Sequence, residues 1–203
     1  MTPNIEYYLA PQSPWTYLGH RRFADIAARA GAQVTLLPID LGKVFPISGG
    51  LPLPKRAPQR QAYRLVELKR FSEALELPLN LHPKFFPVPG DAAARLIHAA
   101  DMQQGTGAAM QLAGAVLQAV WAEEENIDDR ATLAALVRRC GLPADLLDVA
   151  ATADVQARYD AATQRAIDAG VFGAPSYVID GEIFWGQDRL DFVERRLAAA
   201  SSS

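Results

Sequence analysis

Residues 4–40 read NIEYYLAPQSPWTYLGHRRFADIAARAGAQVTLLPID, and this stretch decides the fold. Its first six residues are β-prone, and its last eight form a short apolar run rich in β-branched side chains, typical of a buried strand. Between these two segments Ser13 can cap a helix, Pro14 fits the first helical position, and Gly31 can end the helix. Strand, helix and strand in this order predict a βαβ unit with parallel strands.

The chain changes character after this unit. Residues 43–57 (KVFPISGGLPLPKRA) are rich in glycine and proline, which predicts a long ordered loop, serving as a lid over a binding site, rather than a regular element. Apolar residues then recur at helical spacing in the middle of the chain. Helices are expected over residues 58–77, 91–104, 108–125, 129–140 and 154–169.

The last part of the chain returns to strands. Two β-prone segments, SYVID and EIFW, are joined through Asp180-Gly181, a dipeptide typical of tight hairpin turns. Asp188 can then cap a final helix. We therefore expect an α/β fold, in which residues 1–42 and 171–203 form one mixed sheet with its helices and residues 43–170 form the lid loop and an all-helical insertion.

Composition limits the function. A chain of 203 residues with a formal net charge of −3 and a pI near 5.6 fits one compact domain and lacks the positive field of a nucleic-acid-binding protein. Cys140 is the only thiol, so an intramolecular disulfide or a CxxC pair is excluded. No leader sequence, membrane span or paired metal-ligand spacing is apparent. We expect a soluble cytoplasmic protein that binds no metal, nucleic acid or membrane.

Two blocks of sequence resemble a known family. They are SPWTYL at 13–18 and GVFGAPS at 170–176, the latter continuing into GEIFWGQDRL at 181–190. The chain resembles the branch of the thioredoxin superfamily that carries an all-helical insertion, and within it the 2-hydroxychromene-2-carboxylate isomerases and the kappa-class glutathione transferases. The resemblance implies a thioredoxin-like domain with an inserted helical domain. It has weaker support at Pro58, Arg60, Tyr63, Arg70, Phe86, Pro87 and Arg95.

The resemblance implies glutathione as cofactor and Ser13 as the catalytic residue. Ser13 stands where disulfide oxidoreductases of the superfamily carry their first cysteine, so disulfide exchange is excluded here. A helix N-terminus lowers the pKa of a nearby thiol, and a serine hydroxyl can donate a hydrogen bond to the resulting thiolate. Alternatively, Ser13 is only a helix cap. Serine as the nucleophile is disfavoured because no histidine is placed to act as its base.

The resemblance also implies a glutathione-binding set. Ala174 and Pro175 match a cis-proline turn that contacts peptide-like ligands, whereas an ordinary trans proline is the alternative. Gln187, Asp188 and Arg189 match the stretch that receives the γ-glutamyl end, although Asp188 could be a plain cap.

Arg60 matches a basic position of the family, which implies that it recognises a carboxylate of glutathione or of an aromatic acid. Alternatively, it belongs to a charge run on a solvated surface. In this reading Arg64, on the same helix face as Arg60, has no functional role. The full cluster comprises Lys55, Arg56, Arg60, Arg64, Lys69 and Arg70.

Trp15 and Tyr17 could line a pocket for an aromatic substrate, or could simply be core, and Trp15 is the better pocket candidate. The family implies an isomerase that acts on an aromatic α-keto acid by reversible thiolate addition, working as a homodimer. A glutathione transferase and a glutathione- or peptide-binding protein without turnover remain alternatives. Departures from the family pattern at Ala10, Pro46, Gly50 and Pro89 fall on the substrate side and leave the substrate open.

Overall fold

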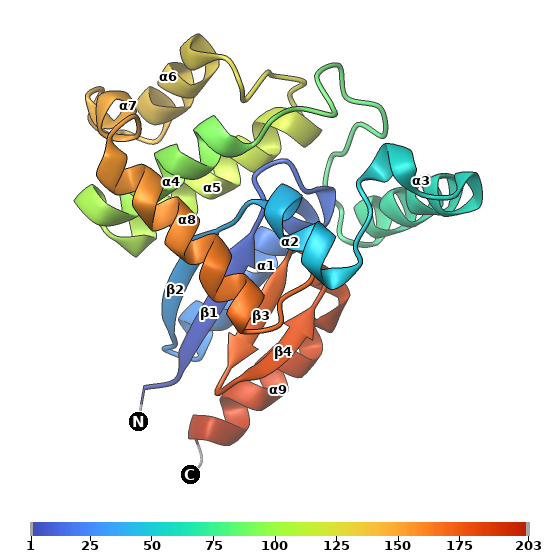
Figure 1. The fold of residues 1–203 in the computed structure, drawn as a ribbon. Helices are drawn as coiled ribbons and strands as arrows, with labels where there is room; N and C mark the ends of the chain where they lie inside the picture. Colours follow the sequence, from blue (N-terminus) through green and yellow to red (C-terminus); the bar gives the residue numbers. More distant parts are fainter. Residues whose placement is uncertain (1, 202–203) are drawn as a thin grey trace.

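The computed structural model describes residues 2–201. Within this range four strands form one mixed sheet in the order β2-β1-β3-β4 (Figure 1). β1 (Asn4–Leu9) runs parallel to β2 (Gln33–Pro38), whereas β3 (Ser176–Ile179) is antiparallel to both β1 and β4 (Glu182–Trp185). The predicted α/β fold with a helical insertion between the two pairs of strands is confirmed.

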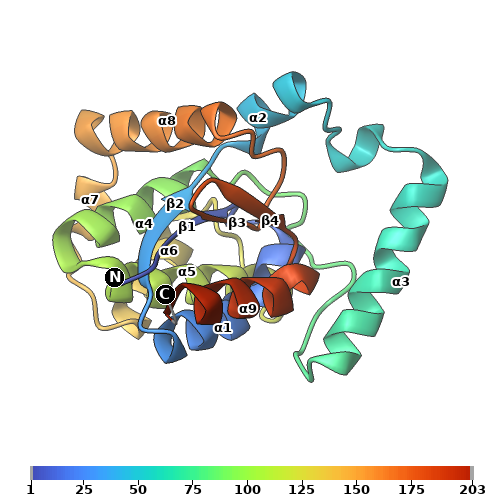
Figure 2. The ribbon, with the colours of Figure 1, turned by 90° about the horizontal axis from the view of Figure 1, so that it is seen from below.

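Helices cover both faces of the sheet. α1 and α9 lie on one face, and α2 and α8 on the other (Figure 2). α3 projects away from the sheet in both views (Figures 1 and 2). None of the described helices is long and apolar enough to cross a membrane. The helix bounds are α1 Pro14–Arg29, α2 Leu41–Ser48, α3 Pro58–Ala74, α4 Asp91–Gln104, α5 Thr106–Trp121, α6 Arg130–Arg139, α7 Leu146–Val149, α8 Ala153–Asp168 and α9 Leu190–Ser201, with 3-10 turns η1 Leu53–Lys55 and η2 Gln187–Arg189.

α1 begins and ends where the sequence predicts. The Oγ of Ser13 accepts a hydrogen bond from the amide of Thr16 at 3.2 Å, and Pro14 occupies the first turn, where its missing N–H is not needed. At the other end Gly31 adopts a φ of +59°, and the amide of Ala32 donates to the carbonyl of Ala27. This is the Schellman arrangement, which favours glycine because of its left-handed backbone.

The inserted helices share one hydrophobic core with the sheet. Side chains of β1 and α1 belong to the same buried cluster as side chains of α4, α5 and α6. Trp121, at the end of α5, is fully buried in this cluster. The insertion is therefore packed as part of one body, and the division of the chain at residues 42 and 171 into two domains stays a prediction.

The predicted lid loop at 43–57 is wrong in its first part, because residues Leu41–Ser48 form α2 with Pro46 inside it. Asp40 caps this helix by accepting from the amide of Gly42 at 2.7 Å, and Val44 is buried against the core. Proline removes one hydrogen bond from a helix, but a short helix has few such bonds to lose. Tertiary contacts therefore outweigh the local preference of the sequence.

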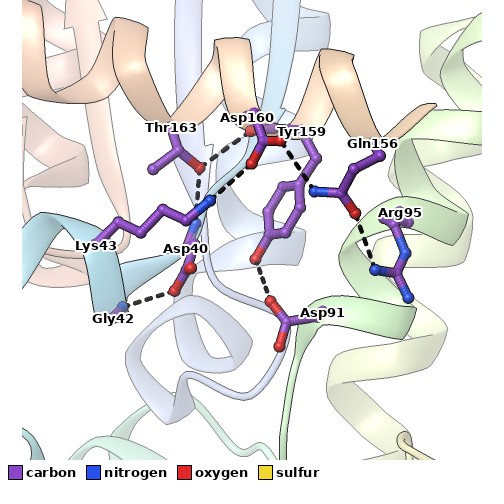
Figure 3. Close-up of polar contacts among 9 residues, drawn as sticks. All are labelled: Asp40, Gly42, Lys43, Asp91, Arg95, Gln156, Tyr159, Asp160 and Thr163. Atoms are coloured by element: carbon purple, nitrogen blue, oxygen red, sulfur yellow. Dashed lines mark hydrogen bonds and ion pairs between the residues drawn. The ribbon is translucent and has the colours of Figure 1, made fainter. Parts of the chain in front are cut away.

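A polar network anchors α2 to its neighbours (Figure 3). Lys43 forms an ion pair with Asp160 of α8 at 2.7 Å, and the amide of Asp40 donates to Oγ1 of Thr163 at 3.0 Å. Tyr159, also on α8, donates to Asp91 at the start of α4. These contacts hold α2 against α8 and α8 against α4.

Candidate active site

The strand register brings three distant segments to one edge of the sheet. Ser176 pairs with Tyr8 on one side and with Trp185 on the other. Because β3 is antiparallel to both neighbours, the end of β1, the start of β3 and the end of β4 meet at this edge. Ser13, the Ala174-Pro175 turn and the η2 turn follow or precede these strand ends directly. Ligands bind at this kind of edge in open sheets with parallel strands.

Ser13 links two of these segments. Its side chain is 7% exposed, and its Oγ donates a hydrogen bond to the carbonyl oxygen of Ala174 at 3.3 Å. Hydroxyl hydrogen bonds are usually about 2.7–2.8 Å long, so this contact is weak and the hydroxyl can turn to a stronger acceptor. Ser13 also caps α1, so the cap interpretation and the catalytic interpretation are compatible.

The Ala174-Pro175 peptide bond is cis, as the resemblance implied. Both residues are buried, and the carbonyl of Pro175 accepts a hydrogen bond from the amide of Gly186 at 2.9 Å. This bond extends the pairing of β3 with β4 as far as the η2 turn. The structure therefore connects the turn at Pro175 to the predicted γ-glutamyl-binding residues.

The η2 turn rests on α1 at a glycine. A Cβ built on Gly19 would lie 2.7 Å from the Cβ of Gln187, so a larger residue at position 19 would push the turn away. Gly19 is six residues along α1 from Ser13, which places the contact about 9 Å further along the helix axis. The turn and Ser13 therefore mark two ends of one stretch of α1.

Gln187 is buried, and both polar atoms of its amide lack a hydrogen-bond partner within residues 2–201. Asp188 and Arg189 are more exposed and form an ion pair with each other at 3.0 Å. The prediction that Asp188 caps the last helix is wrong. Asp188 lies inside η2, and α9 begins two residues later at Leu190, because the chain makes a 3-10 turn before the helix.

The remaining predicted residues differ in position. Trp15 lies in the first turn of α1, two residues from Ser13, whereas Arg60 is exposed on α3. Tyr17 is core: its hydroxyl donates to the carbonyl of Pro78 at 2.6 Å, and burial raises its pKa. Trp15 is half-buried and packs edge-on against Phe71 of α3 at 6.2 Å between ring centres, so it stays the better pocket candidate.

The solvated-surface position expected for Arg64 is wrong. The structure packs its guanidinium against Phe86, 5.3 Å from the ring centre. A signal was available, because Leu68 and Phe71 follow Arg64 at positions i+4 and i+7 and both face the core. Their spacing places Arg64 on the buried stripe of α3.

The described residues include no group of three or more histidine, cysteine, aspartate or glutamate side chains that could hold a metal ion. The three histidines are dispersed: His98 is buried and donates to the carbonyl of Pro38, His20 is buried between Tyr7 and Met110, and His82 is exposed. Cys140 is partly buried against the core, and burial raises the pKa of its thiol. The chemistry available at the sheet edge is therefore that of a hydroxyl, backbone amides and a helix N-terminus.

Comparison with known proteins identifies the family of the chain. Residues 4–198 match the model of the DSBA-like thioredoxin domain. The chain is 30% identical over 199 residues to a 2-hydroxychromene-2-carboxylate isomerase of Sphingobium xenophagum, covering 97% of this chain and 99% of that protein. A protein of the same name from Pseudomonas sp. strain C18 is 28% identical over 201 residues, covering 97% and 91%.

The fold has a close counterpart among solved structures. A structure of a 2-hydroxychromene-2-carboxylate isomerase superimposes with a TM-score of 0.81 at 23% identity, covering 98% of this chain and 96% of that one. Family model, relatives and fold agree over nearly the whole length. The chain therefore belongs to the DSBA-like thioredoxin-domain family and, within it, to the 2-hydroxychromene-2-carboxylate isomerases.

Proposed function

We propose that the protein is a glutathione-dependent isomerase of an aromatic α-keto acid. The names of its relatives support isomerisation as the class of reaction. The observation that carries the glutathione dependence is the position of Ser13, whose hydroxyl stands at the N-terminus of α1, 3.3 Å from the carbonyl of Ala174 at the ligand-binding edge of the sheet.

Three features of this position would stabilise a thiolate. The Ser13 hydroxyl can donate one hydrogen bond to it in place of the long bond to Ala174. The amide of Trp15 lies in the first turn of α1, where backbone N–H groups have no acceptor within the helix. The positive end of the α1 dipole adds to both, and together they would lower the pKa of a thiol placed there.

The rest of the edge suits the remainder of a tripeptide. Backbone groups of Ala174 and Pro175 would contact its peptide part, and Asp188 and Arg189 would pair with the charged groups of its γ-glutamyl end. The buried amide of Gln187 offers a donor and an acceptor that lack partners within the described chain. These unpaired groups favour a role for this edge in binding a polar ligand over a purely structural role.

Glutathione, when bound, would supply a thiolate that adds to the conjugated double bond of the substrate, allows rotation about the resulting single bond, and leaves again. The carbon–sulfur bond that forms is the bond that later breaks, so substrate and product have the same composition. The residues of this chain hold the sulfur and stabilise its charge. Trp15 would lie beside the aromatic part of the substrate.

A glutathione transferase and a binding protein without turnover are the alternatives. The changes on the substrate side favour them, since Pro46 lies inside α2 and Gly50 packs directly against the ring of Phe45, where the family has polar residues. A transferase would release the adduct as product. The binding protein would bind glutathione but convert no unsaturated acid.

Calorimetric titration with glutathione, followed by turnover assays on unsaturated aromatic α-keto acids, tests the proposal. We expect binding of glutathione, and isomerisation that stops when glutathione is replaced by S-methylglutathione, which has no free thiol. Isomerisation at the same rate without glutathione would contradict the cofactor. We further propose a cytoplasmic homodimer, which cell fractionation and sedimentation analysis test.

A further inference from the structure

A cavity lies between α3 and the segment that follows it. Its volume is about 380 Å³, within the range of small-ligand sites. Most of its lining is apolar, from Leu53, Leu65, Leu81 and Phe86, with three prolines, and Gln61 and His82 also line it. Arg64 is the arginine in this lining, so a single strong positive charge faces an apolar chamber.

Arg64 is held in place by aromatic rings. Its guanidinium carbon lies 5.3 Å from the centre of the Phe86 ring and 5.6 Å from that of Trp121. Both distances are within the range of cation–π contacts, which fix the plane of the guanidinium. The orientation of this side chain is therefore set before any ligand arrives.

The charge of Arg64 has no counter-charge in the described chain. No carboxylate among residues 2–201 lies within ion-pair distance of it, and its buried Nη2 has no hydrogen-bond partner. Arg56 stands nearby, and burial together with this second cation lowers the pKa of Arg64 to about 10. Arg64 is thus charged at neutral pH and half-buried, and its buried Nη2 without a partner is costly unless a ligand completes it.

We propose that this cavity binds the carboxylate of an aromatic acid, with Arg64 paired to the carboxylate and Phe86 against the ring. Arginine suits this role because its planar fork of donors matches the two oxygens of a carboxylate. The apolar walls favour an aromatic body over the polar backbone of glutathione. This inference deepens the proposed function, on which it rests, by naming the residue that recognises the acid group of the substrate.

The cavity adjoins the Ser13 edge through a short piece of chain. Pro87 lines the cavity, and Gly90 lies three residues further on, at most about 11 Å away. Gly90 in turn lies directly against the side chain of Gln12, the residue before Ser13. As part of the proposal, we expect a substrate anchored at Arg64 to extend toward the sulfur-binding position.

Titration calorimetry with sodium cinnamate, an unsaturated aromatic carboxylate, tests the site, with cinnamamide as the neutral isostere. We expect the whole protein to bind cinnamate and to bind cinnamamide much more weakly. Arg64→Met should raise the Kd for cinnamate about 10- to 100-fold, the range for one lost charged hydrogen-bonding pair, and leave glutathione binding unchanged. Arg64→Lys should restore part of the affinity. Lys69→Gln, at an exposed lysine of the same helix, is the control for loss of a cation and should change neither Kd.

The outcomes separate this site from the proposed function. The proposal is overturned if wild-type protein does not discriminate cinnamate from cinnamamide, if Arg64→Met binds cinnamate normally, or if Lys69→Gln weakens binding equally. A selective loss of glutathione affinity in Arg64→Met would also overturn it and assign Arg64 to glutathione. If glutathione does not bind but cinnamate binds through Arg64, the cofactor proposal fails and the carboxylate site stands. Thermal melts of each variant, with Arg64→Lys as the conservative one, identify loss of fold.

Discussion

The Oγ of Ser13 donates a hydrogen bond to the carbonyl of Ala174, a residue 161 positions later in the chain, at 3.3 Å. This contact ties the N-terminus of α1 to the entry of β3 across the edge of the sheet. Its length leaves the hydroxyl free to exchange Ala174 for a more strongly accepting ligand atom. In the free protein Ser13 therefore makes a weak hydrogen bond across this edge, and its hydroxyl can donate to an anionic ligand instead.

Replacing Ser13 by alanine separates its two roles. Loss of the cap should lower the free energy of unfolding by about 0.5–2 kcal/mol, whereas loss of the donor to the thiolate should lower kcat roughly 100-fold. Asp129→Ala is the matched control, because Asp129 caps α6 by accepting from the amide of Thr132. We expect this control to lose similar stability and keep full activity. Equal activity of the two variants would show that Ser13 is only a cap.

Gly19→Ala should disturb the η2 turn. The added methyl group would lie 2.7 Å from the Cβ of Gln187, so we expect a loss of about 1–3 kcal/mol in unfolding free energy and weaker glutathione binding. Gly107 in α5 has nothing within 4 Å of the same position. Gly107→Ala should therefore leave stability unchanged or raise it by up to about 1 kcal/mol. Chemical denaturation measures the unfolding free energy of both variants. An equal change in the two would contradict close packing of Gly19 against Gln187.

Arg64→Met should fold at least as stably as the wild type. The substitution removes a buried donor without a partner, worth about 1–3 kcal/mol, and loses cation–π contacts of about 0.5–2 kcal/mol. We expect the unfolding free energy to stay constant or to rise by up to about 2 kcal/mol. A fall in the unfolding free energy, measured by urea denaturation, would mean that Arg64 serves the fold rather than a ligand.

The stability should fall in mild acid because of His98. Burial, assisted by Arg158, lowers the pKa of this imidazole from 6.5 to about 4. Between pH 6.5 and pH 4, His98 is therefore protonated in the unfolded chain but not in the folded one. The contribution of His98 to the unfolding free energy is fully present above pH 6.5 and is lost as the pH falls to 4. The full effect is roughly 3 kcal/mol.

His98→Gln isolates this contribution, since glutamine keeps an N–H for the carbonyl of Pro38. Urea midpoints measured from pH 7 to pH 4 should fall less steeply in this variant than in the wild type. His82→Gln, at an exposed histidine, should retain the wild-type slope. Identical slopes for wild type and His98→Gln would rule out His98 as the source.

The sheet and its edge could be predicted from the sequence because local signals agree with the tertiary structure there. Ser13, Pro14 and Gly31 mark the ends of α1, and at the hairpin both Asp180 and Gly181 adopt the positive φ that their sequence suggests. The resemblance to the thioredoxin superfamily then implies that Ser13 lies near the Ala174-Pro175 turn, and the structure has this contact. For these elements the chain neighbours alone determine the conformation.

The remainder depends on contacts between distant segments. Proline and glycine predict a loop for residues 43–57. Because Val44 is buried in the core and Lys43 forms an ion pair with Asp160, the first part of this stretch is helical instead. Arg64 lies in a charge run that would normally be solvated, and only the packing of Phe86 and Trp121 around it shows otherwise. Both differences arise because the partners lie far away in the sequence.

The pKa of the thiol of bound glutathione tests the central claim most directly. Thiolate absorbance in the ultraviolet, recorded against pH at saturating protein, measures it in the wild type and in Ser13→Ala. An ordinary cysteine thiol has a pKa of about 8.5, and we expect the wild type to hold the bound thiol at least one unit below that value. In Ser13→Ala the pKa should return most of the way to 8.5 while glutathione still binds. A bound thiol with the same pKa in both proteins would contradict the assignment of Ser13 as the group that stabilises the thiolate.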